Sequence, residues 1–354
     1  MTKRSESIDF WRGLILVFIF INHVPGNPLE AATHRNYGWS DAAEAFVFIS
    51  GLALAMAWGR LADRPAELRR RAFARAGYLY RVQLALAAAA VLVAWVGFAV
   101  TGLEAVRDMH GRALFFADPA LAVAGLLSMS YQIGYFNILP LYVVLIAGGP
   151  LALMGAARAP AATLAVSIAI YGAARLGGLS LPGAQGAGWF FNPFAWQLLF
   201  VIGVIVGTLW REGPPRSPTL AALAAGVVAF ALAARTDVAG LAPGLGEWVG
   251  PRLDGHKPQL GLARLLHFLA LAYLLAILGV ARPVLDSAVG RTITAMGRAA
   301  LPVFCVGSVL AAIGQVLTIA ADRTGAAPAE LVGLAWVCLG IMMLIVTPAL
   351  SRGW

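Results

Sequence analysis

Residues 78–101 read YLYRVQLALAAAAVLVAWVGFAVT, and after Arg81 this stretch contains no charged side chain. A helix of about 20 apolar residues crosses the hydrocarbon core of a bilayer, so the stretch predicts a membrane-spanning helix. Of the 354 residues, 60% are hydrophobic and 12% are charged. An ordinary soluble domain has about a quarter charged residues, so lipid is the expected solvent for this chain.

Apolar stretches of the same kind recur along the whole sequence, with short polar breaks between them. Backbone groups inside a bilayer must be hydrogen-bonded within their own element, which favours helices. We therefore expect an all-α, polytopic membrane bundle of about ten transmembrane helices, and a single domain over residues 1–354, because no repeat or long linker divides the chain. The expected spans are residues 8–24, 41–60, 78–101, 136–156, 160–175, 194–211, 218–234, 260–281, 297–321 and 328–350.

The net charge of +9 could suggest nucleic acid, but the basic residues lie in the loops between apolar spans. With the N-terminus inside, most of them fall on the inner side, including the arginines from Arg60 to Arg81. This bias follows the positive-inside rule and places both termini in the cytoplasm. We expect the lipid bilayer as a partner and no nucleic acid.

Four outer segments, residues 25–40, 102–135, 176–193 and 235–259, are rich in Gly and Pro and carry most of the polar residues expected on the outer side. Contacts with an acceptor are expected there. Both cysteines, Cys305 and Cys338, fall inside expected helices and are interpreted as packing residues. We expect no bound metal.

The first expected helix carries Asp9, Arg12 and His23. Eleven residues at 100° each differ by only about 20° from three full turns, so Arg12 and His23 share one face, roughly 16 Å apart. Ionisable groups inside a bilayer usually face a bundle interior or a wet cavity and are candidates for function. The alternative is that Arg12 reaches the inner interface and His23 the outer one. Asp9 is the expected partner of Arg12.

The second expected helix opens with Asp41 and Glu44, on the side where His23 emerges. A carboxylate bonded to one imidazole nitrogen would orient the other as a general base, which makes His23, Glu44 and Asp41 the catalytic candidates. The competing interpretation is a capping box, in which Asp41 caps the helix and Glu44 reaches back to it.

These residues resemble the family 3 acyltransferases, in which Asp, two residues and Arg are followed eleven positions later by His. The second helix matches as well, with EAFVFISG at residues 44–51, although Glu44 replaces the commoner Asp. Three later segments resemble the OpgC branch, which is associated with succinylation of periplasmic glucans: FNILPLY at 136–142, WFFNPFAW at 189–196 and RLLHF at 264–268. The resemblance implies an acyltransferase of the bacterial inner membrane with a periplasmic glucan as acceptor.

The expected topology brings further polar groups to the outer half of the bundle. We expect substrate contacts from Asn137, Asn192, Trp196, Arg264 and His267, because an aromatic face beside hydrogen-bonding groups commonly holds a sugar-like ligand. Their ordinary alternatives are hydrogen bonds between helices for the asparagines, an interfacial aromatic belt for the tryptophan and a satisfied interior histidine for His267.

Acyl-CoA, as succinyl-CoA or acetyl-CoA, is the expected donor. Its phosphates would bind Arg69, Arg70, Arg71 and Arg75, and its pantetheine arm would pass Arg12 to bring the thioester to His23. The arginine run is otherwise a topology anchor. Two other classes stay open: a transporter that uses His23 and Glu44 as a proton relay, and a passive assembly partner.

Overall fold

The computed structural model describes residues 3–184, 186, 188–210, 212–236, 244–249 and 253–351 of the chain. Residues 237–243 and 250–252 of the outer segment expected over 235–259 lie outside this description. Helices dominate the described residues, and the pairing between strand-like residues there is one isolated antiparallel bridge, Pro182 to Gly188.

Each of the ten stretches expected to span a membrane forms a helix. Seven of these helices are long and apolar enough to cross a bilayer, α9 and α12 are apolar but shorter, and α1 carries more charge. The ten are α1 (Lys3–Asn22), α2 (Ala42–Trp58), α3 (Pro65–Thr101), α7 (Ile138–Arg158), α8 (Pro160–Gly177), α9 (Pro193–Leu209), α10 (Pro218–Thr236), α12 (Leu262–Leu278), α15 (Ala300–Thr324) and α16 (Ala329–Leu350).

Short helices fill the connections between these ten. They are α4 (Glu104–Asp108), α5 (Ala113–Ala117), α6 (Pro119–Leu127), α11 (Leu245–Val249), α13 (Arg282–Leu285) and α14 (Ala288–Arg298), with 3-10 turns η1 (Pro28–Ala32), η2 (His34–Asn36), η3 (Gly59–Leu61), η4 (Met109–Gly111) and η7 (Lys257–Gln259).

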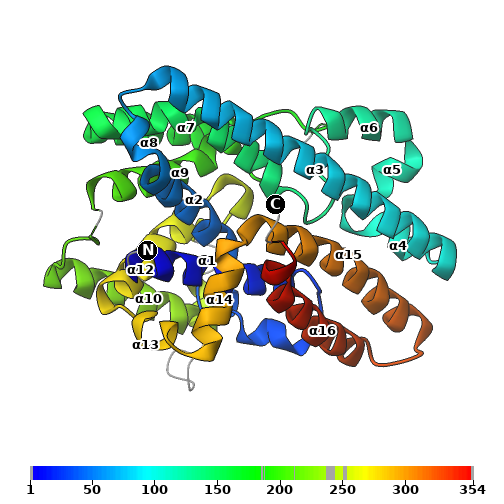
Figure 1. Ribbon diagram of the computed structural model, residues 1–354. Coiled ribbons are helices and arrows are strands. Elements are labelled where there is room, and N and C mark those ends of the chain that lie inside the picture. The colour runs from blue at the N-terminus through cyan, green and yellow to red at the C-terminus, as the bar shows by residue number, and fades with distance from the viewer. Residues whose placement is uncertain are drawn as a thin grey trace.

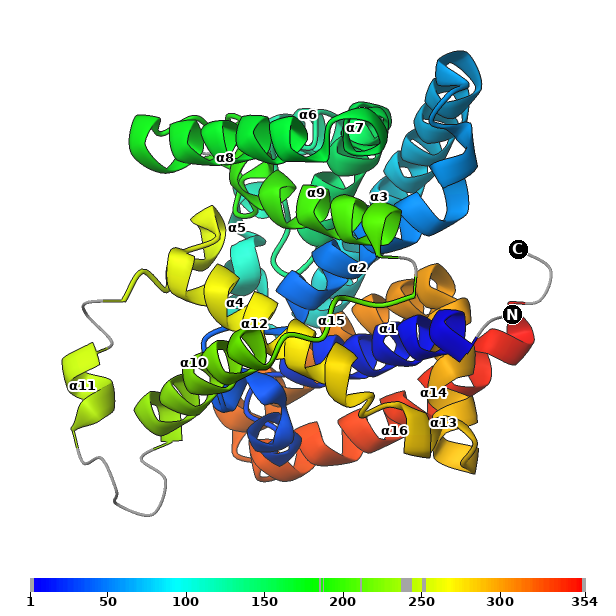
Figure 2. The same cartoon turned by 90° about the vertical axis from the view of Figure 1, so that its left-hand side faces the viewer.

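The bundle is arranged around α1, α2 and α15. Helix α2 packs on α9, α1 on α14, and α15 on both α3 and α16 (Figure 1). The start of α3 and the α4–α5 segment lie at opposite ends of the molecule in the same view. The start of α1 and the end of α16 lie on one side of the molecule (Figure 2).

The outer surface of the bundle is apolar, as expected for helices in lipid. Large hydrophobic side chains stay exposed along α3, α10 and α16, among them Leu92, Trp95, Leu223, Met342 and Leu350. A water-soluble protein rarely exposes such extended apolar surface, so the structure supports a multi-pass membrane protein.

Helices α2 and α9 pack closely against each other. A Cβ added at Gly51 would overlap the backbone carbonyl of Phe200, and one added at Gly203 would overlap that of Phe48. The backbones approach this closely because neither glycine has a side chain, the arrangement that membrane helices use for tight packing. Gly51 of the EAFVFISG segment therefore has a packing role that fixes α2 and its outer end.

Candidate functional site

Helix α2 begins with a complete capping box. The Asp41 carboxylate accepts from the amide of Ala43 at 2.9 Å, and the Glu44 carboxylate accepts from the amide of Asp41 at 2.8 Å. The capping interpretation of these two acidic residues is thus confirmed. Capping satisfies amides that would otherwise lack partners at a buried helix start.

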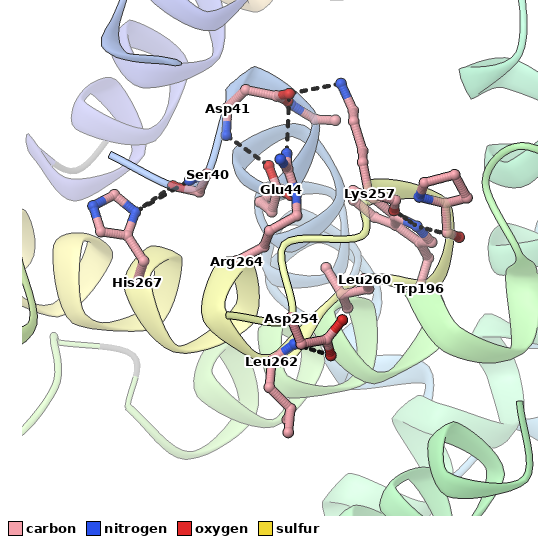
Figure 3. Close-up of polar contacts among 12 residues, drawn as sticks. Ser40, Asp41, Glu44, Trp196, Asp254, Lys257, Leu260, Leu262, Arg264 and His267 are labelled. Carbon is pink, nitrogen blue, oxygen red and sulfur yellow. Dashed lines mark hydrogen bonds and ion pairs between the residues drawn. The ribbon is translucent and has the colours of Figure 1, made fainter. Parts of the chain in front are cut away.

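Two basic residues complete a buried ion cluster around this cap (Figure 3). Arg264 donates to Glu44 at 2.7 Å and to Asp41 at 3.0 Å, and Lys257 donates to Asp41 at 2.6 Å. The side chain of Glu44 is fully buried and that of Arg264 is 11% exposed, whereas that of Lys257 is 33% exposed. The cluster pairs two carboxylates with two cations, which is how buried charges are tolerated.

The turn that carries Lys257 is held by residues expected to contact substrate. The indole of Trp196 donates to the carbonyls of Lys257 and Pro258, both at 3.2 Å. The amide of Asn192, which also caps α9, donates to Gln259 at 2.8 Å. Trp196 and Asn192 are fully buried, so their direct role is to position this turn.

Asp254 anchors the other end of the same segment. Its carboxylate bonds Arg175 and accepts from the amide of Leu262, the first residue of α12, at 2.9 Å. Burial would raise the pKa of Asp254, but these donors outweigh it and hold the pKa below its usual value. The ionised carboxylate therefore ties α8 to the start of α12, the helix that brings Arg264 to the cluster.

His267 has its ordinary partners within the bundle. Its Nδ1 accepts from the amide of Ser40 at 3.3 Å and lies 2.8 Å from the Ser40 hydroxyl, and Trp39 packs edge-on against the ring. The side chain is 3% exposed. This geometry matches a satisfied interior histidine.

His23 lies just beyond the end of α1, in a tight turn where its amide bonds the carbonyl of Phe20. The helix expected over 8–24 thus ends at Asn22. The imidazole stacks on Tyr135 with ring centroids 4.3 Å apart, and a narrow pocket beside it is lined by α1 and by Val303, Phe304 and Ser308 of α15. Within the described part of the chain, neither ring nitrogen makes a hydrogen bond.

The backbone of His23 is held by a relay from the outer segment. The Gln315 amide donates to the His23 carbonyl at 2.8 Å, and Arg112 donates to the Gln315 side-chain oxygen at 2.6 Å. Arg112 is 4% exposed, and its other bond goes to the carbonyl of Val106. These bonds hold the backbone of His23 and so fix the position from which its side chain extends.

His110 also contacts the Tyr135 ring, in a tilted arrangement with the ring centroids 5.4 Å apart. Burial, followed by the charge of Arg112, lowers the pKa of His110 to about 4. Its ring is therefore neutral at neutral pH.

The ion cluster and His23 belong to one electrostatic neighbourhood. Charges on Lys257, Asp41 and Arg35 all act on the His23 ring. The expected bond between Glu44 and His23 is not among the contacts of the described residues, because Arg264 and the Asp41 amide occupy the Glu44 carboxylate. Glu44 acts within the cluster.

The other candidate residues take no part in the bonds of the ion cluster or of His23 among the described residues. Arg12 pairs with Asp9 at 3.0 Å, as expected, and its guanidinium also contacts the carbonyl of Gly297. Asn137 precedes α7 without a capping bond from its side chain. Near the start of α3, four exposed arginines follow one another, Arg69, Arg70, Arg71 and Arg75. Arg71 pairs with Glu67 at 2.5 Å, and Arg75 covers the ring of Tyr78.

Sequence reasoning missed Lys257, Tyr135, Arg112 and Gln315. The first three lie in irregular outer segments where no pattern singles them out, although an uncharged polar residue such as Gln315 within a long apolar helix is a usable signal. Within the described residues no group of three or more His, Cys, Asp or Glu side chains could hold a metal ion.

Comparison with known proteins gives one match. A family model described as OpgC protein matches residues 4–354, which is nearly the whole chain. No curated protein and no solved structure matches.

Proposed function

Because the chain belongs to the OpgC family, which implies an acyltransferase-type role in glucan modification, we propose that it transfers an acyl group from cytoplasmic acyl-CoA to a hydroxyl of a periplasmic glucan. The proposed acyl group is succinyl in preference to acetyl. The proposed location is the bacterial inner membrane, with both termini in the cytoplasm. The start of α1 and the end of α16 lie on one side of the molecule, which supports placing both termini on the same side of the membrane.

The observation that carries the chemistry is that the His23 imidazole lines a small pocket and makes no hydrogen bond to any residue that the structure describes. In the proposed reaction His23 accepts the proton of a sugar hydroxyl while the sugar oxygen bonds to the thioester carbonyl carbon. The C–S bond then breaks, and the departing CoA thiolate takes the proton from the imidazolium. The base needs an unoccupied nitrogen, and both ring nitrogens are without bonds in the described part of the chain.

Direct transfer is the first choice, with an acyl-imidazole intermediate as the variant. The relay from Arg112 through Gln315 supports either route because it holds the His23 backbone in place. A base positioned in advance accelerates proton transfer, and displacement of about 1 Å can cost a hundredfold in rate.

The charges near His23 support an anionic acyl group. Lys257 is partly exposed, with one bonded carboxylate at 2.6 Å, and Arg35 is 38% exposed beside Glu30. The distal carboxylate of a succinyl group is a suitable extra partner for these cations, whereas an acetyl group has no charge to offer. Arg264 is less suited, because two carboxylates already occupy its guanidinium.

The donor would reach this site from the opposite end of the bundle. The exposed arginines near the start of α3 can bind the phosphates of coenzyme A. In Figure 1 the start of α3 lies at the end of the molecule away from α4 and α5. The pantetheine arm would then extend past Arg12 to His23.

The experiment that tests the proposed function is mass spectrometry of periplasmic glucans from cells with and without the intact gene. The expected result is loss of succinyl mass from the glucan when the gene is removed. Loss of acetyl mass would keep the reaction and change the donor. Unchanged glucan would contradict the proposal.

A further inference from the structure

An open groove lies beside the ion cluster, on the outer side in the proposed orientation. Its cavity volume is about 440 Å³, within the roughly 300–1,000 Å³ typical of ligand sites. The segment after α8 and the turn η7 form its walls, which consist of Gly178, Ser180, Gly188, Trp189, Phe190, Pro258 and Gln259.

The lining has the chemistry of a carbohydrate site. None of these described lining residues carries a charge, so the groove offers no ionic partner. Phe190 is 44% exposed and presents an aromatic surface, on which the C–H face of a sugar ring can stack.

Polar groups for sugar hydroxyls accompany this ring. The Gln259 side-chain oxygen accepts from Asn192, and within the described residues its amide hydrogens have no acceptor. The Ser180 hydroxyl makes one long bond of 3.3 Å to a neighbouring carbonyl. Both groups can bond hydroxyls of a neutral ligand.

The turn η7 joins this groove to the candidate site. Pro258 and Gln259 line the groove, while the preceding residue, Lys257, bonds Asp41 and acts on His23. A chain-like ligand that leaves the groove along η7 therefore meets Lys257 and the ion cluster. A polymer, unlike a single sugar, can occupy both places.

We propose that this groove is a subsite for glucose residues of the acceptor glucan, several units away from the hydroxyl that is acylated. The inference rests on the proposed function for the identity of the polymer. The groove would select long acceptors over short ones, because a short acceptor reaches His23 without touching Phe190.

The test is isothermal titration of the purified full-length protein with a linear glucose hexasaccharide, without acyl donor. Phe190→Ala should weaken binding about tenfold, which corresponds to loss of one aromatic contact, and Phe190→Tyr should restore it. Phe73→Ala is the matched control, since Phe73 is an exposed phenylalanine of α3 and should leave binding unchanged.

The outcomes separate this inference from the proposed function. Equal hexasaccharide binding by wild type and Phe190→Ala would overturn the proposal that the groove is a glucan subsite, whatever the enzyme acylates. If binding depends on Phe190 but the protein transfers no acyl group, the glucan subsite is supported and the proposed acyl transfer is contradicted. Kinetics add a second check: in Phe190→Ala, KM should rise more for the hexasaccharide than for a glucose disaccharide.

Discussion

Replacing Arg264 with methionine removes the cation that is bonded to the fully buried Glu44. The carboxylate then keeps one bond, from the amide of Asp41, and has no positive partner at bonding distance, while Asp41 itself keeps Lys257. Breaking a buried ion pair from one side costs about 3–5 kcal/mol, because the other charge stays in a poorly solvated position. We expect Arg264→Met to lower the free energy of unfolding by that amount.

Replacing Glu44, the partner of Arg264, should lower the free energy of unfolding by a smaller amount. Glu44→Gln keeps an oxygen that can accept from the Asp41 amide, and Arg264 keeps its bond to Asp41. We expect a loss of about 1–3 kcal/mol. In the double variant no unpaired carboxylate is left at position 44, so its loss should be smaller than the sum of the two single losses by about 1–3 kcal/mol.

The assay is reversible unfolding of the purified protein in mixed micelles, followed by circular dichroism. Arg323→Met is the control, because Arg323 pairs with Asp322 at 3.8 Å on the surface and such pairs contribute about 0–1 kcal/mol. A loss below about 1 kcal/mol for Arg264→Met, or strictly additive losses in the double variant, would refute the account of the cluster.

Three further perturbations test the packing, the relay and the outer segment. Gly51→Ala forces α2 away from the facing backbone and should lower stability by about 1–3 kcal/mol, whereas Gly77→Ala, which has open space in α3, should be neutral or stabilising in the same melting assay. Gln315→Glu keeps an acceptor for the buried Arg112 but loses the donor to the His23 carbonyl. We expect kcat to fall roughly tenfold to a hundredfold with little change in melting temperature. An unchanged kcat would show that the bond to the His23 carbonyl has no role in the mechanism. Because the pKa of His110 is about 4 in the folded protein and near 6.5 unfolded, the unfolded state binds more protons below pH 6.5, and stability should fall as the pH drops from 6.5 towards 4. His110→Gln should flatten the dependence of melting temperature on pH over that window, and an unaltered slope would count against a buried neutral imidazole.

The positions of the long helices could be predicted because the backbone N–H and C=O groups of each apolar stretch must form hydrogen bonds within that stretch in lipid. Helix α14 was not among the expected spans, since residues 288–298 are amphipathic and carry Arg291 and Arg298. It packs on α1 through Gly13 and Gly297, whose missing side chains let the two backbones meet. Such contacts depend on small residues, which periodicity of apolar residues does not reveal.

In the candidate site too, contacts between residues close in sequence could be predicted, and contacts between distant residues could not. The pair of Asp9 with Arg12 and the capping box of Asp41 with Glu44 are local in sequence, and the structure contains both. Lys257, by contrast, reaches Asp41 across 216 residues. Which cation pairs with a carboxylate depends on how the helices pack together. The sequence could therefore place Glu44 in the first turn of α2 without assigning Arg264 as its partner.

Acyl transfer by the purified protein tests the central claim most directly. The full chain in proteoliposomes would receive succinyl-CoA and a neutral glucan. The mass of the glucan would be measured for wild type and for His23→Ala, with Arg323→Met as the control. The account predicts a succinyl mass gain for wild type and the control, and none for His23→Ala that is still folded. Transfer at the wild-type rate by His23→Ala would contradict the proposed base, and no mass gain with wild type would contradict the proposed reaction.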